Sequence, residues 1–252
     1  MKEKIKCKTC TNLHCFIREN LSPKWVDFVD SSKQQVWYKK GEYIIRQGLP
    51  VEGIFFIQLG KVKVVVNSGQ DREQIVRLAA DGHILGHRGL GNDVYPISAI
   101  ALDDSLVCFI KNDVLNKLFQ ENPKLVIALM QFYSHELRKM EIRVMAIAQM
   151  IMRERIADAL LLFCESFGLN NDKELNVSFS REDIASMAAT ASEQTIRQLT
   201  EFEKEGLIAK RGRKIALLNL DGLNKIIYKY LPYSVKELYL LFIIVPPLQY
   251  FL

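Results

Sequence analysis

The sequence lacks the segments that carry a chain out of the cytoplasm. The first residues, Met1–Lys6, are charged and no apolar stretch follows them, so we expect no secretory signal. Near the other end, the apolar run Leu238–Val245 is too short to span a bilayer, and Pro246 and Pro247 interrupt it. We therefore expect a cytoplasmic protein with no membrane partner, and we assign no role to the apolar tail, residues 231–252.

Cysteine is scarce, and enzyme motifs are missing. The five cysteines are an odd number, and in a chain without an export signal they favour thiols or metal ligands over a disulfide framework. There is no G-x-S-x-G, no P-loop, no H-E-x-x-H and no pair of carboxylates in a recognisable cleft motif. We therefore expect no catalytic residues and no enzyme.

A strong excess of one charge is also lacking. Hydrophobic residues make up 49% of the chain and charged residues 25%, which is enough apolar material for a globular core. The net charge of +5 is mild. It does not suit a wholly basic coat protein.

The stretch Phe179–Leu217 predicts two helices joined by a tight turn. Ser180 is a typical N-cap for the first helix. Small residues then allow a second helix to cross closely from Ser192, and Gly206 is placed to end it. We expect the inner faces of the two helices to carry Ile184, Met187, Ala188, Ile196, Leu199 and Phe202. This is the pattern of a helix-turn-helix, whose second helix enters the DNA major groove.

A short basic turn follows between two apolar strands, like the wing of a winged helix. Its cations can neutralise phosphate and add affinity without sequence information. An ordinary helical hairpin with a solvated basic loop is the simpler alternative. The predicted DNA contacts are Ser180, Arg181, Ser192, Glu193, Gln194, Arg197, Lys210, Arg211, Arg213 and Lys214.

Short strands dominate the block from about Gln34 to Ile110. Glycines recur at spacings typical of turns, and Val62, Val64 and Val66 alternate with their neighbours as in a strand with one wet face. Many short strands without intervening helices predict an antiparallel barrel or jelly roll. A helix capped by Asn112 or Asp113 is expected to follow.

A long helix then carries a heptad seam. The seam holds its 4,3 spacing over more than three heptads, which is typical of a helix that pairs with a second copy. The neighbouring Leu125, Leu129 and Phe132 predict a second apolar face, packed on the barrel; a helix laid only on its own core is the alternative. The seam comprises Val126, Met130, Tyr133, Leu137, Met140, Val144, Ile147 and Ile151.

A further amphipathic helix, Arg155–Phe167, completes the pattern, with Ile156, Ala159, Leu160 and Phe163 inward. The fold class is therefore α+β. The expected divisions are a cysteine-containing segment 1–20, a β-roll sensor domain 21–122, a dimerisation helix 123–152, a winged helix-turn-helix 153–230 and the tail 231–252.

Three of the five cysteines, Cys7, Cys10 and Cys15, lie within nine residues. They are one short of a tetrahedral set, for which Cys108 is the first candidate and Cys164 the reserve. Thiolates suit zinc and iron–sulfur clusters alike. A thiol redox pair, a zinc staple in an interaction protein, and unengaged thiols remain open alternatives.

The order of these elements resembles the Crp/Fnr superfamily of bacterial transcription regulators, up to about residue 230. The stretches KGEYIIRQG and GIFFIQLGKVKV match its β-roll, and S-E-Q-T-I-R is similar to its recognition motif R/V-E-T-V/I-x-R. The resemblance implies that Glu193 and Arg197 read base edges, since arginine can bond guanine and a carboxylate can accept from cytosine. It also implies a homodimer, an operator in double-stranded DNA, and RNA polymerase as a partner.

The cysteines resemble the oxygen-sensing Fnr branch. That branch has a trio spaced C-x2-C-x5-C, here C-x2-C-x4-C, and a distant cysteine in a stretch like S-x-V-C-x-I, here SLVCFI. The resemblance implies that Cys7, Cys10, Cys15 and Cys108 hold a [4Fe–4S] cluster. It further implies that oxygen or nitric oxide acts on the cluster and alters the packing of the long helix, with the spacing of the recognition helices as the readout.

Other sensing chemistries are less well matched. Cyclic-nucleotide members have G-E-L followed by R-S-A, whereas this chain reads GHRGLGNDVYPISA, with His87 for the glutamate and Ile97 for the phosphate-binding arginine. We therefore do not expect cyclic AMP. The effector-pocket candidates are Gly86, His87 and Ser98, and His83 or His87 could ligate haem, the alternative route to nitric oxide.

Overall fold

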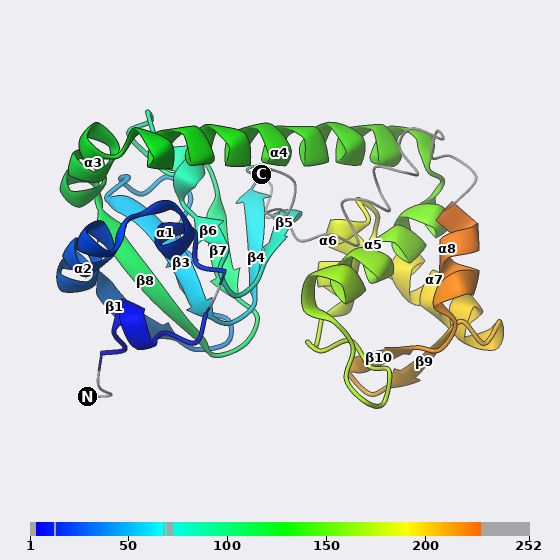
Figure 1. Ribbon diagram of the computed structural model, residues 1–252. Coiled ribbons are helices and arrows are strands. Elements are labelled where there is room, and N and C mark those ends of the chain that lie inside the picture. The colour runs from blue at the N-terminus through cyan, green and yellow to red at the C-terminus, as the bar shows by residue number, and fades with distance from the viewer. Residues whose placement is uncertain (1–3, 13, 68, 70–72, 228–252) are drawn as a thin grey trace. The chain divides into compact units, whose positions relative to one another are not determined.

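The computed structural model describes residues 4–12, 14–67, 69 and 73–227, in two compact units, Met1–His135 and Glu136–Leu252. The apolar tail predicted at 231–252 lies outside the described residues. The boundary between the units falls within one helix, α4 (Pro123–Gln149). Each unit is described by itself, since their relative placement is not determined (Figure 1).

The first unit is an antiparallel β-roll, as the turn spacing predicted. One sheet has the strand order β1-β8-β3-β6 and the other β2-β7-β4-β5, and every pairing is antiparallel. The strands are β1 (Gln34–Tyr38), β2 (Tyr43–Ile45), β3 (Gly53–Leu59), β4 (Val62–Asn67), β5 (Glu73–Ala79), β6 (Ile84–Leu85), β7 (Ser98–Ala101) and β8 (Ser105–Lys111).

The predicted alternation in β4 is only partly correct. Val62 and Val64 are buried, but Val65 is buried as well and Val66 is half-buried. The cause is a register shift: Val64 pairs with Arg77, whereas Val65 pairs with Ile75. The shift lets two consecutive side chains face inward and reverses the pattern after Val64.

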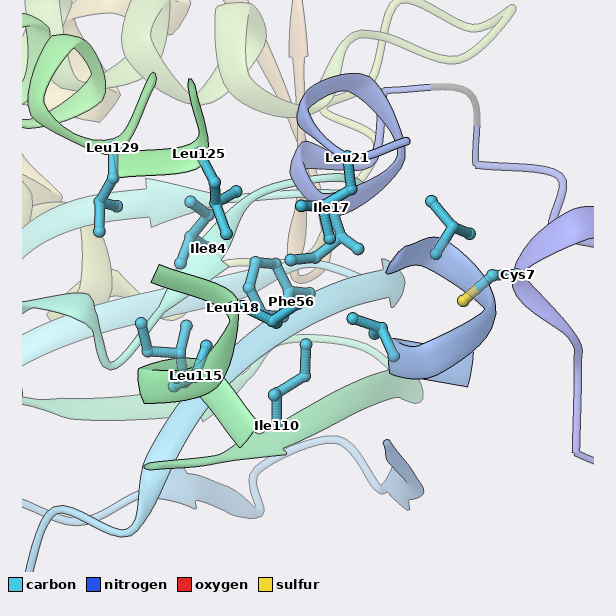
Figure 2. Packing of buried hydrophobic residues seen from close by; sticks show 13 residues of the cluster. Cys7, Ile17, Leu21, Phe56, Ile84, Ile110, Leu115, Leu118, Leu125 and Leu129 are labelled. Carbon is cyan, nitrogen blue, oxygen red and sulfur yellow. The ribbon is translucent and has the colours of Figure 1, made fainter. Parts of the chain in front are cut away.

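Helices precede and follow the strands of the roll, and one short helix lies between β6 and β7. They are η1 (Cys7–Thr9), α1 (Phe16–Asn20), α2 (Pro23–Ser32), η2 (His87–Gly89) and α3 (Asn112–Glu121). Of these, the sequence analysis predicted only α3, whose N-cap is Lys111 rather than Asn112 or Asp113. One core cluster joins all of these helices except η2 to the roll, and it includes Ile17 of α1, Phe56 of β3, Leu118 of α3 and Leu125 of α4 (Figure 2).

The second unit contains a winged helix-turn-helix. It comprises α5 (Met152–Phe167), α6 (Arg181–Met187), α7 (Ser192–Lys204), β9 (Ile208–Arg211), β10 (Lys214–Leu217) and α8 (Leu220–Ile227). The inward residues predicted for α5 are all fully buried. The sequence analysis predicted that α5 begins at Arg155 and that the long helix α4 extends to residue 152. Instead α4 ends at Gln149 and Ile151 is the N-cap of α5.

The helix pair follows the predicted boundaries. Ser180 caps α6: its hydroxyl accepts from the Asp183 amide, and the Asp183 carboxylate accepts from the Ser180 amide, each at 2.9 Å. Gly206, with φ +70°, follows the end of α7 in a left-handed conformation that glycine adopts at little cost.

The sequence analysis placed one residue of α7 in the core incorrectly. Leu199 and Phe202 are fully buried, but Ile196 is 51% exposed. Thr195 and Gln198 take the inner positions instead. The buried face therefore runs through 195, 198, 199 and 202, which leaves Ile196 on the outer face.

Candidate functional site

Cys108 lies in the middle of β8, where the topology brings it close to the N-terminal segment. It pairs with Gln35 of β1 on one side and with Phe56 of β3 on the other. The Gln35 side-chain amide donates to Cys108 Sγ, and the Cys108 thiol donates to Gln58 Oε1, each at 3.6 Å. The strand pairing therefore fixes this thiol beside the part of the sheet that the N-terminal segment contacts.

The N-terminal segment is bonded to the roll at several points. The Asn12 side chain donates to the Ile57 carbonyl at 3.1 Å, and the Cys7 amide donates to Asp30 Oδ1 at 2.8 Å. Gly82, with φ +86°, lies directly against this segment, because a Cβ there would be 2.6 Å from the carbonyl oxygen of His14. The close approach holds Asn12 and His14 against the turn before β6.

Three of the four predicted ligands affect one another electrostatically. Burial raises the pKa of the Cys108 thiol; nearby Lys33 lowers it, and the charges of Cys15 and Cys10 raise it further. Burial also raises the pKa of Cys15, and the charge of Cys10 contributes to the increase. The structure therefore places Cys108 within electrostatic reach of Cys10 and Cys15, although it lies far from both in the sequence.

Cys7, the fourth predicted ligand, faces a buried lysine. Lys33 Nζ donates to Cys7 Sγ at 3.0 Å and to the Ile5 carbonyl at 3.0 Å, and it lies 2.9 Å from Asp30 Oδ1. Burial raises the pKa of Cys7 to about 11, although the Lys33 ammonium acts in the opposite direction. The sequence analysis missed Lys33 because its burial depends on the position of α2.

No group of three Cys, His, Asp or Glu side chains in the described part of the chain has the arrangement of ligands around a single ion. The reserve ligand, Cys164, is half-buried on α5, in the second unit. Burial and the neighbouring Glu165 raise its pKa.

Two of the three effector-pocket candidates, Gly86 and His87, line a small hollow in the roll, whereas Ser98 does not. His87 is 3% exposed, and its ring meets Phe132 and Tyr133 edge-on at 5.0 and 5.4 Å. Burial, together with the charges of Arg77 and Arg88, lowers the pKa of His87 to about 3. The Tyr133 hydroxyl donates to the His87 carbonyl.

The hollow is lined by Val64, Arg77, Leu85, Gly86, His87, Arg88 and Ile97. Its cavity volume of about 10 Å³ is far below the roughly 300–1,000 Å³ usual for small-molecule sites. The other candidates already have partners, because the Ser98 hydroxyl accepts from the Gln47 amide at 2.9 Å and His83 Nδ1 from the Ala80 amide at 3.1 Å.

The predicted seam forms an exposed apolar stripe along α4. Met130, Leu137 and Val144 are 66%, 62% and 63% exposed, and Ile151, just beyond the helix, is 59% exposed. The other four seam residues are half-buried. On the second apolar face, Leu125 and Leu129 are buried in the core of the roll, as predicted.

The outer face of α7 presents the predicted base readers. Glu193, Gln194 and Arg197 are exposed, and the Thr190 hydroxyl donates to Gln194 Oε1 at 2.7 Å. Ile196 lies on the same outer side, where an apolar side chain can contact a thymine methyl group. Hydrophobicity alone favoured a core position for Ile196, so the sequence analysis did not include it.

The wing cations are held by carboxylates that the sequence analysis also missed. Lys214 Nζ and Arg211 Nη1 lie 2.8 and 3.5 Å from the Glu174 carboxylate, which is itself buried. Lys210 Nζ lies 2.9 Å from Glu203. Arg213, in the turn between β9 and β10, is exposed and has no carboxylate partner among the described residues. Within the described residues, we also find no helix long and apolar enough to cross a membrane.

Two family models match the chain on either side of α4. The cyclic nucleotide-binding domain matches residues 35–122, and the Crp-like helix-turn-helix domain matches residues 154–226. The chain is 28% identical over 216 residues to the transcriptional activator protein anr of Pseudomonas aeruginosa, covering 84% of this chain and 88% of that protein. It is 27% identical over 223 residues to electron transport regulator A of Shewanella oneidensis, covering 87% and 89%.

A solved structure has the same fold. FixK2 from Bradyrhizobium japonicum is 23% identical, with a TM-score of 0.67 over 77% of this chain and 96% of that one. The β-roll, the helix-turn-helix and the two domain matches agree with one another. The chain therefore belongs to the Crp/Fnr family of transcription regulators, whose members bind DNA, typically as dimers, and are not enzymes.

Proposed function

We propose that this regulator senses oxygen, nitric oxide or redox state through a [4Fe–4S] cluster. Its ligands would be Cys7, Cys10, Cys15 and Cys108. The observation that supports the proposal is that Cys108 on β8 lies within electrostatic reach of Cys10 and Cys15, although no feature of a strand requires a cysteine there. The name of one relative, electron transport regulator A, points to the same class of signal.

The donor set fits this group in number and chemistry. Four thiols match the ligands of a [4Fe–4S] cluster. Each cysteine would ligate a different iron, so the four sulfurs need not surround one point as they do at a single ion. Cys7 would have to exchange its contacts with Lys33 and Asp30 for iron. When bound, such a cluster supplies reactivity toward oxygen and nitric oxide.

The core of the roll provides a path from the cysteines to α4. Cys7 is part of the same buried cluster as Leu125 and Leu129, the residues of α4 that face the roll (Figure 2). Cores are close-packed, so a shift of the N-terminal segment changes the packing under α4. The exposed seam on the other side of α4 is the surface that would pair with a second copy.

The proposed response is a change in operator binding. Glu193, Gln194 and Arg197 would read base edges, with Ser192 beside them. Ser180 and Arg181 at the start of α6, together with the wing cations, would contact phosphates. A dimer would place two α7 helices on two half-sites about one turn of DNA apart. RNA polymerase is the expected partner on the DNA.

The test is anaerobic purification followed by an absorption spectrum, with iron and acid-labile sulfide measured on the same sample. We expect broad visible absorption and about four irons and four sulfides per chain. In Cys108→Ser all three should be lost.

The matched control is Cys164→Ser, which removes a half-buried cysteine from α5 and should retain the cluster. A colourless wild-type protein after anaerobic purification, or equal iron in the two variants, would rule out the proposed site.

A further inference from the structure

Arg143 joins three helices of the second unit through one side chain. It lies on α4 and is largely buried. Nη1 pairs with the carboxylate of Asp158 on α5, and Nη2 donates to the backbone carbonyl of Met187 on α6. Asp158 is fully buried, so the ion pair lies inside the unit.

The carbonyl that Arg143 binds is next to the turn of the helix-turn-helix. Met187 is the last residue of α6, Ala188 is its C-cap, and Ala189 has a φ of +49°, which is unusual for a residue with a Cβ. The recognition helix begins three residues later, at Ser192. The end of a helix carries partial negative charge, so a guanidinium is favourable there.

The geometry requires an arginine. A guanidinium is a planar fork whose two terminal nitrogens can donate to two acceptors at once. A lysine could satisfy Asp158 with one ammonium but would not present the same fixed fork to Met187. The buried Asp158 carboxylate needs a cationic partner, because an unpaired charge in the interior is costly.

We propose that Arg143 is a positioning residue for DNA reading. It holds the turn between α6 and α7 at a fixed place on α4, so a displacement of α4 is passed to the recognition helix. The inference concerns only the second unit and applies whatever signal the first unit senses.

The test compares Arg143→Lys with the wild type. The probe is a duplex that the wild-type protein selects from a random-sequence pool. We expect Arg143→Lys to form the same dimer with nearly the same thermal stability, because the introduced ammonium can still pair with Asp158, but to bind the duplex about tenfold or more weakly. Hydrogen exchange at residues 187–191 should rise in this variant alone.

Arg138→Lys is the matched control, since Arg138 is an exposed arginine on the same helix and should tolerate the change. Wild-type affinity in Arg143→Lys would overturn the inference. If Arg143→Lys is unstable, Asp158→Asn, which leaves the Met187 bond in place, must retain more affinity than Arg143→Met. A wild-type protein that selects no duplex would instead refute DNA binding itself.

Discussion

At the scale of single residues, His87 should make stability depend on pH. Its pKa is about 3 in the folded chain, whereas an unfolded histidine titrates near 6.5. The folded pKa is lowered, so its contribution is present above pH 6.5 and is lost as the pH falls below that value. Arg77 and Arg88 face the ring and disfavour its protonation further.

We predict that His87→Phe will remove this dependence. Between pH 7.5 and 5.5, His87 alone should lower the free energy of unfolding by about 1.4 kcal/mol. Urea unfolding at both pH values measures the free energy of unfolding. Between pH 7.5 and 5.5 this free energy should fall by that amount more in the wild type than in His87→Phe. His83→Gln, at an exposed histidine, is the control and should behave as the wild type. Equal pH dependence in His87→Phe would show that His87 is not held neutral.

The residues also differ in how far the sequence could foresee them. The Ser180 cap and the strand around Cys108 were predictable because each combines a distinctive residue type with a local pattern, whereas the role of Cys108 as a ligand stays a prediction. Ile196 was not, because hydrophobicity predicts burial without giving the phase of the helix. Lys33, Glu174 and Glu203 are ordinary charged residues in the sequence. They acquire their contacts only when α2, the loop before α6 and the wing fold against their partners.

At the scale of elements, the wing has internal ion pairs that limit its free positive charge. Lys210, Arg211 and Lys214 each lie near Glu174 or Glu203, whereas Arg213 does not. Arg213 should therefore release counterions on binding DNA as a full charge, while the paired cations should contribute less.

We predict that Arg213→Gln will reduce the dependence of log K on log salt concentration by about 0.9, the value for one phosphate contact. Fluorescence anisotropy over a salt series on the selected duplex measures the slope. Lys225→Gln, on α8, is the control and should leave it unchanged. A slope unaltered by Arg213→Gln would place the wing tip away from the phosphates.

The capping box of α6 should contribute measurably to stability. Asp183 and Ser180 each satisfy a backbone amide of the other, so Asp183→Ala leaves the Ser180 amide without its partner. We predict that the free energy of unfolding falls by about 1 kcal/mol. Thermal or urea unfolding checks this, with Glu182→Ala, an exposed neighbour, as the control.

The elements themselves were largely predictable where their patterns were long. The heptads of α4, the core of α5 and the helix pair α6–α7 all repeat a face over several turns. The two-residue β6 and the short β7 lack enough residues for a period, and the shift in β4 depends on its partner β5. The helix α2 could have been found, because Pro23 at its first turn and Val26 and Val29 on one face are recognisable helix features.

At the scale of the whole molecule, the exposed stripe of α4 predicts a dimer. We expect Leu137→Asp to raise the dimer dissociation constant about 100-fold or more, because pairing would bury two unpaired carboxylates. Sedimentation over a concentration series measures the change, and affinity for the selected duplex should fall with it. Ser134→Asp, exposed on the same helix but outside the seam, is the control. An unchanged dimer in Leu137→Asp would require another interface.

Gly82 links two parts of the chain that would otherwise change independently during evolution. Its space is filled by the backbone of residue 14, and its φ of +86° already restricts it to glycine, asparagine or aspartate. If a homologue loses the N-terminal cysteine segment, the space beside this position becomes free, but the positive φ still restricts which residues fit. Among homologues, side chains at this position should therefore appear together with the loss of the cysteine segment, and asparagine and aspartate should appear first.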